Sequence, residues 1–156
     1  MRLWHKDLIP YLPDLQLKGQ WRECALIADA LAKNGTPNHL LVNRVTEYSI
    51  WHLDEYFLIL VKEMKKRGFG FKKNSIHNFI HNLGVYNRDF RNNENYLCLN
   101  DADLFCGWHD YKYLRICMSN LAEKHIYGIG KSRITDEEWQ RLLDGYKNIT
   151  GEEYKI

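Results

Sequence analysis

The sequence has little of what marks a membrane protein, a disulfide-stabilised protein or a nucleotide-binding enzyme. No apolar run reaches the roughly 18 residues that suggest a membrane span, and residues 1–7 lack the apolar stretch of a secretory signal. The four cysteines form no CxxC pair, so we expect free thiols. Walker, GxGxxG and GxSxG motifs do not occur. These absences favour a cytoplasmic protein with no membrane association and no nucleotide or acyl-transfer chemistry.

Prolines are also scarce, with three in 156 residues, and no Ser/Gly/Pro-rich linker or repeat divides the chain. The apolar share of 45% and the charged share of 27% are those of an ordinary globular protein that buries a core. We therefore expect one domain over residues 1–156. The net charge of +2 is too small to attract a polyanion by itself.

Apolar residues recur at helical spacing through most of the chain, and no segment alternates apolar and polar residues long enough to indicate a sheet. Asp14 is a suitable helix cap, and Thr135 with Glu138 forms a capping box. We expect helices over residues 14–34, 37–67, 74–84, 114–121 and 135–145, the second with a kink allowed. Residues 85–108 are expected to be irregular, either as a functional loop or as a mobile segment. The expected fold class is all-α, a single-domain compact helical bundle.

The first expected helix carries the most informative polar pattern. Gln16, Gly19, Gln20 and Glu23 are three, four and seven positions apart and so share one helical face. A glycine inside a helix costs about 0.5–1 kcal/mol relative to alanine, so Gly19 suggests that another group comes close there. The alternative is a solvated face with a packing glycine.

The distribution of basic residues also allows two interpretations. Lys18 and Arg22 are four residues apart, a spacing at which like charges repel and a bound phosphate would relieve the repulsion. A basic run follows over residues 62–73. It either complements the dipole at a helix C-terminus or contacts phosphates. His77 and His81 have the spacing of two metal ligands but no obvious third ligand, so we expect no metal and no cofactor.

Three short segments resemble one family of DNA repair enzymes. Residues 12–17 followed by Trp21-Arg22-Glu23 are similar to the start of the pyrimidine-dimer DNA glycosylases, the phage endonuclease V-like glycosylase/AP lyases. Lys66-Arg67-Gly68-Phe69 with Lys72 resembles a second element of that family, and residues 121–124 resemble a third. The resemblance implies an all-α, endonuclease V-like fold.

The resemblance also implies a reaction and a set of site residues. In the family the α-amino group of the first residue attacks the sugar C1′ of a damaged pyrimidine, forms a Schiff base and breaks the strand by β-elimination. Carried over to this chain, the nucleophile is Met1 and the carboxylate that stabilises the cationic sugar is Glu23. The implied partner is double-stranded DNA with damaged bases, with no obligate protein partner. The implied DNA-binding residues are Arg2, Gln16, Arg22, Lys66, Arg67 and Lys124.

The chain departs from the family at its N-terminus, and this leaves alternatives open. Alignment without a gap puts Arg2 at the position of the nucleophile, whereas one inserted residue in the N-terminal arm puts Met1 there. We prefer the second register. The aromatic and basic C-terminal strip of the phage enzyme is missing. The alternatives are a non-catalytic nucleic-acid-binding protein of the same fold and a helical protein-interaction module.

Overall fold

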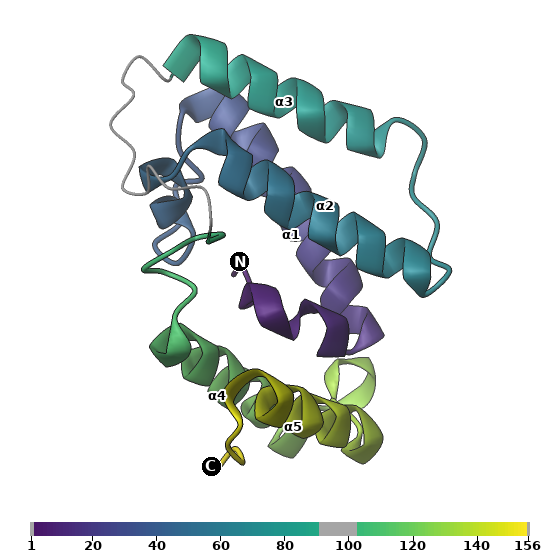
Figure 1. Ribbon diagram of the computed structural model, residues 1–156. Coiled ribbons are helices and arrows are strands. Elements are labelled where there is room, and N and C mark those ends of the chain that lie inside the picture. Colours follow the sequence, from purple (N-terminus) through teal and green to yellow (C-terminus); the bar gives the residue numbers. More distant parts are fainter. Residues whose placement is uncertain (1, 91–102, 156) are drawn as a thin grey trace. The chain divides into compact units, whose positions relative to one another are not determined.

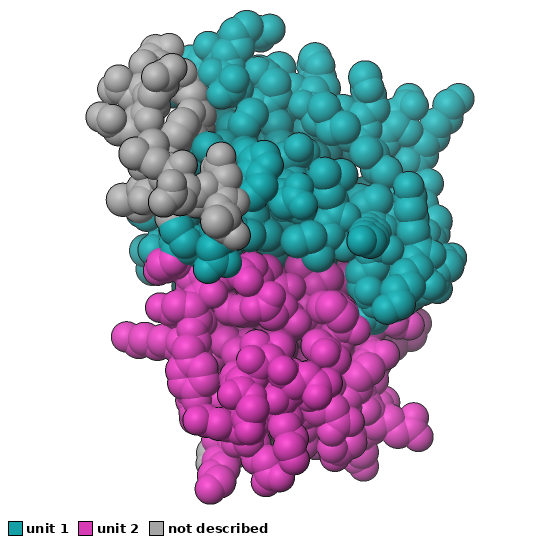
Figure 2. Space-filling view, viewed as in Figure 1, with its two compact units in different colours: residues 1–3, 18–106 teal, residues 4–17, 107–156 magenta. Residues whose placement is uncertain are grey.

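The computed structural model describes residues 2–90 and 103–155, and every regular element within these ranges is a helix. The expected all-α class is therefore confirmed (Figure 1). None of the described helices is both long and apolar enough to cross a membrane. Contacts divide the chain into unit 1 (Met1–Leu3 and Lys18–Cys106) and unit 2 (Trp4–Leu17 and Gly107–Ile156), which Figure 2 colours separately. The single domain over residues 1–156 stays a prediction.

Helix α1 (Asp14–Asn34) has the limits that its sequence predicts. Its first residue is acidic and its last turn contains Lys33, so both ends complement the helix dipole. Cys24, Ala28 and Leu31 are buried on one face, as their spacing predicts. The periodicity of apolar residues and the charges at its two ends therefore agree with the limits of this helix.

Unit 1 is completed by η2 (Asn43–Glu47), α2 (Ile50–Lys66) and α3 (Ser75–Phe90). Helices α2 and α3 lie side by side (Figure 1), and Phe57 of α2 stacks on Phe79 of α3 with 3.7 Å between ring centroids. Trp21 of α1 also packs near Phe57, with 6.2 Å between centroids. Because α2 contacts both other helices, its aromatic face forms the centre of this core.

Unit 2 contains η1 (Lys6–Tyr11), α4 (Tyr111–Ile126), η3 (Gly130–Ser132) and α5 (Asp136–Thr150). The capping box predicted ahead of α5 is present, with reciprocal hydrogen bonds between Thr135 and Glu138. Arg141 of α5 donates a 2.9 Å hydrogen bond from Nη2 to the carbonyl oxygen of Leu12. The short N-terminal helix η1 is therefore held against α5.

The helical stretch expected over residues 37–67, with a kink allowed, is wrong for residues 37–49 and confirmed for α2. Asn38 has a left-handed φ of 52°, the chain then forms only the short 3-10 helix η2, and the regular helix begins at Ile50. Left-handed backbone cannot continue an α-helix, and asparagine adopts it more readily than most residues do. Ser49 is the residue that precedes α2.

Two glycines do not end helices as expected. Helix α3 continues through Gly84 to Phe90, because Leu83 and Tyr86 extend its buried face beyond the glycine. Helix α5 continues through Gly145 and ends at Gly151, which has a left-handed φ of 76°. A Cβ atom at Gly145 would overlap the ring of Tyr11, so this glycine allows a close approach.

Two further expectations are corrected in part. The loop expected over residues 85–108 is helical up to Phe90, and residues 91–102 lie outside the described ranges. Cys24 and Cys117 are buried free thiols as expected. Cys106 is disulfide-bonded, so the expectation of free thiols is wrong for this residue. Disulfide formation depends on an approach in space that the spacing of cysteines does not reveal.

Candidate active site

A hydrogen bond joins the start of the chain to helix α1. The backbone N–H of Arg2 donates to Oε2 of Glu23 over 2.9 Å, and both residues are half-buried parts of unit 1. A bond to an ionised acceptor is stronger than one between neutral groups. Two residues predicted for the site, Arg2 and Glu23, therefore meet. The expected nucleophile Met1 lies outside the described residues.

The rotation of α1 within unit 1 is fixed by aromatic contacts. The Trp21 ring lies 5.6 Å from the ring of Phe71 in addition to its contact with the core of α2. One turn earlier, Lys18 Nζ lies 4.0 Å from the centroid of Phe69. The repulsion between Lys18 and Arg22 suggested a bound phosphate. The cation–π contact shows that the charge of Lys18 is already stabilised by an aromatic ring. With Trp21 turned inward, the next residue along the helix, Arg22, is exposed.

The polar face expected on α1 is divided between core and surface. Gln20 is 1% exposed, so it belongs to the core. Burial, with a smaller contribution from the charge of Glu23, raises the pKa of the Cys24 thiol far above its usual value. The thiol is therefore protonated at neutral pH. At Gly19, no described atom lies within 4 Å of the position that a Cβ atom would take.

The basic run at the end of α2 is partly used inside the protein. Arg67 Nε donates to Glu63 Oε1 over 2.7 Å, and the two side chains are only 13% and 10% exposed. Lys66 Nζ lies 3.9 Å from the same carboxylate but its side chain is 75% exposed. Arg67 therefore neutralises a buried carboxylate, whereas Lys66 can still reach a phosphate.

The remaining predicted DNA contacts differ in their surroundings. Arg22 is exposed, and within the described ranges no hydrogen bond or ion pair holds its guanidinium. Gln16 is half-buried in the first turn of α1, and Lys124 is exposed in the last turn of α4. Both belong to unit 2. His77 and His81 are exposed on α3, and no group of three metal-ligating side chains occurs among residues 2–90 and 103–155.

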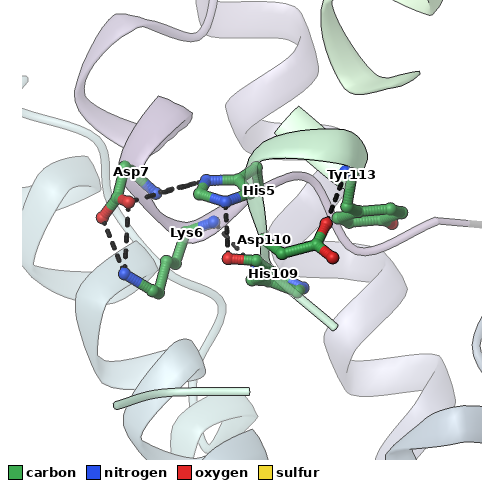
Figure 3. Close-up of polar contacts among 6 residues, drawn as sticks. All are labelled: His5, Lys6, Asp7, His109, Asp110 and Tyr113. Carbon is green, nitrogen blue, oxygen red and sulfur yellow. Dashed lines mark hydrogen bonds and ion pairs between the residues drawn. The ribbon is translucent and has the colours of Figure 1, made fainter. Parts of the chain in front are cut away.

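A buried histidine pair in unit 2 was not predicted (Figure 3). Nδ1 of His5 accepts from the Asp7 backbone N–H over 3.3 Å, so Nε2 carries the proton and donates to the carbonyl oxygen of His109 over 2.8 Å. The Lys6 backbone N–H donates to Nδ1 of His109 over 3.0 Å. Burial is the main cause that lowers the pKa of His5. These bonds attach η1 to the segment preceding α4, which is a structural role.

One of these arrangements had a signal in the sequence. Glu63 and Arg67 are four residues apart, the spacing of a helical ion pair, and this spacing could have separated Arg67 from the exposed lysines. His5 and His109 have no such signal, because 104 positions separate them.

Comparison with protein families gives a match over the first part of the chain. The family model for pyrimidine dimer DNA glycosylases matches residues 1–77. The matched segment contains α1, α2 and both partners of the hydrogen bond between Arg2 and Glu23. No curated protein and no solved structure matches the chain.

Proposed function

We propose that the chain releases damaged pyrimidines from duplex DNA and then cleaves the strand, because its residues 1–77 match the family model for pyrimidine dimer DNA glycosylases. The proposed nucleophile is the α-amino group of Met1. Such an amine has a reference pKa of about 7.7–8.0, so a neutral, reactive fraction exists near neutral pH. The amine and the carboxylate come from the chain itself, so the proposed reaction requires no cofactor. The proposed location is the cytoplasm.

The proposed reaction has two steps. The amine attacks C1′ of the damaged nucleotide and the glycosidic bond to the base breaks. One nitrogen proton passes to the departing base and the other to O4′ as the sugar ring opens, which leaves a Schiff base. A proton then leaves C2′ and the C3′–O bond breaks, which releases the phosphate at that position. Water finally hydrolyses the Schiff base and frees the amine.

The observation that supports this proposal best is the bond between the Arg2 backbone N–H and Glu23 Oε2 at 2.9 Å. Met1 immediately precedes Arg2 in the sequence, so Glu23 holds the peptide unit next to the proposed nucleophile. A carboxylate there stabilises positive charge as it develops on the sugar and accepts protons from the amine or C2′.

The residues proposed to contact DNA differ in whether their side chains are exposed or already paired within the protein. Arg22, Lys66 and Lys124 are exposed and would bind phosphates, and Gln16 would donate or accept hydrogen bonds at the strand. Arg2 would add positive charge beside the amine and lower its pKa. Arg67 is committed to Glu63 and would act by positioning Lys66.

Substitution of the carboxylate tests the chemistry. Glu23→Gln keeps an oxygen that can accept the bond from Arg2 but removes the charge, so we expect base release and strand cleavage to slow by about 10²-fold or more. The matched control is Glu137→Gln, which removes an exposed carboxylate from α5. Equal activity of the two variants would contradict the role of Glu23. Binding of damaged DNA without base release by the unmodified protein would favour the non-catalytic alternative.

Salt dependence tests the phosphate contacts. Arg22→Ala should reduce the slope of log affinity against log salt by about 0.9, the value for one phosphate contact. Lys147→Ala is the control, because Lys147 already lies 3.3 Å from Glu153 on the exposed surface of unit 2. Affinity that does not respond to salt in any of these proteins would contradict binding to the DNA backbone.

A further inference from the structure

The segment between α4 and α5, which Figure 1 draws in light green, exposes apolar side chains at its tip. Tyr127 is 76% exposed and Ile129 is 88% exposed, and neither lies in a regular helix. Neighbouring large apolar residues this exposed are unusual on a soluble protein and mark contact surfaces. The tip belongs to unit 2 and lies outside the residues assigned to the reaction above.

The segment has a defined conformation. The Ile134 backbone N–H donates to the carbonyl oxygen of Lys124 over 3.3 Å, and His125 Nδ1 lies 3.0 Å from the carbonyl oxygen of Ile134. The Ser132 hydroxyl donates to the carbonyl oxygen of Ile129 over 2.8 Å. A Cβ atom at Gly128 would overlap the Lys124 carbonyl oxygen, so the fold-back requires glycine. The apolar tip is therefore preorganised, which lowers the entropy cost of binding.

The segment over residues 124–134 itself carries cations, and carboxylates flank it at Glu123 and at Asp136, whose Oδ1 lies 3.8 Å from His125 Nε2. Residues 124–134 include Lys124, Lys131 and Arg133 and no carboxylate. All three cations are exposed, and within the part of the chain that the structure describes no ion pair engages them. A hollow of about 400 Å³ beside the tip is lined by Lys124, Ser132 and Glu123 together with the apolar residues. An apolar tip among exposed cations complements a surface that combines phosphates with stacked rings.

We propose that Tyr127 and Ile129 form a wedge that inserts between stacked base pairs of duplex DNA while Lys124, Lys131 and Arg133 bind the flanking phosphates. Apolar side chains inserted in this way unstack a base step and bend the duplex. A damaged step is already partly unstacked, so insertion there costs less than elsewhere. The proposal rests on the proposed function for its substrate, and it assigns a second DNA-contacting element to the chain.

The test uses the full chain and a duplex with 2-aminopurine beside an abasic site, because fluorescence of this base rises when it unstacks. The unmodified protein should raise the fluorescence. Tyr127→Ser and Ile129→Ser should each abolish most of this rise and weaken binding by about tenfold or more, from the loss of a buried apolar side chain. The matched control is Leu40→Ser, because Leu40 is 87% exposed but belongs to unit 1. Thermal unfolding checks that each variant is folded.

The possible outcomes distinguish a failure of the wedge proposal from a failure of the proposed glycosylase and strand-cleavage activity. Unchanged fluorescence and affinity in both wedge variants would overturn the wedge, even if strand cleavage persists. Loss of cleavage in Glu23→Gln with the fluorescence rise retained would support both assignments. A fluorescence rise without any strand cleavage at the abasic site by the unmodified protein would support the wedge and overturn the proposed function. Binding to anionic phospholipid vesicles that is lost in Ile129→Ser, with DNA binding unaffected, would overturn DNA as the partner of this tip.

Discussion

Replacement of Gly19 by alanine separates the stability of α1 from its contacts with a ligand. Gly19 is well inside the helix, and no described atom lies within 4 Å of the position of an added Cβ atom. Alanine is favoured over glycine in a helix by about 0.5–1 kcal/mol, and nothing described offsets this gain. We therefore expect Gly19→Ala to stabilise the protein, with a rise in Tm of about 1–4 °C for a chain of this length.

The same change should damage function. If DNA approaches the backbone of α1 at Gly19, an added methyl group displaces it and weakens binding by about tenfold, which corresponds to about 1.4 kcal/mol. Gly84→Ala is the control, because Gly84 also lies inside a helix with open space around it and should give a similar gain in stability alone. The assays are urea unfolding and DNA titration. A destabilised Gly19→Ala would refute the reasoning about packing, and unchanged affinity would refute the close approach.

Two further substitutions test the stability of each unit. Glu63→Gln removes the carboxylate of the ion pair with Arg67, in which the two side chains are 10% and 13% exposed. Because Arg67 then keeps a partly buried charge without this partner, we expect the free energy of unfolding in urea to fall by about 3 kcal/mol. A fall of less than about 1 kcal/mol would contradict this. In unit 2, burial lowers the pKa of His5, so the folded state binds fewer protons. Stability should be fully present above about pH 6.5 and decrease as pH falls through the lowered pKa. His5→Gln should reduce this dependence whereas His81→Gln, on an exposed residue, should not.

The sequence predicted those helices whose limits are local. The capping box of Thr135 with Glu138 predicted the start of α5, because a cap needs only residues within one turn, and α1 begins at Asp14, where a start was expected. The C-terminal ends of the helices were harder to predict from the sequence. Gly145 looks like a helix terminator in sequence, but its role is set by the Tyr11 ring, which is 134 positions away.

The candidate site was predictable to a similar extent. The segment Trp21-Arg22-Glu23 resembles the family whose model matches residues 1–77. Its three residues have different environments, which helical periodicity alone could not distinguish. The contact of Glu23 with Arg2 depends on how the N-terminal arm returns to α1, and no local pattern specifies that return. Exposure of Ile129 depends in the same way on the fold-back of its segment onto α4.

The most direct test of the central claim is to locate the covalent bond between protein and DNA. The protein, with Met1 verified as its first residue by intact mass, is incubated with abasic-site DNA and borohydride, digested, and examined by mass spectrometry. The account predicts an adduct on the α-amino group of Met1 and no trapping after that amine is acetylated. An adduct on Lys18 or Lys124, or trapping that survives acetylation, would contradict the claim that the N-terminal amine beside Glu23 is the nucleophile.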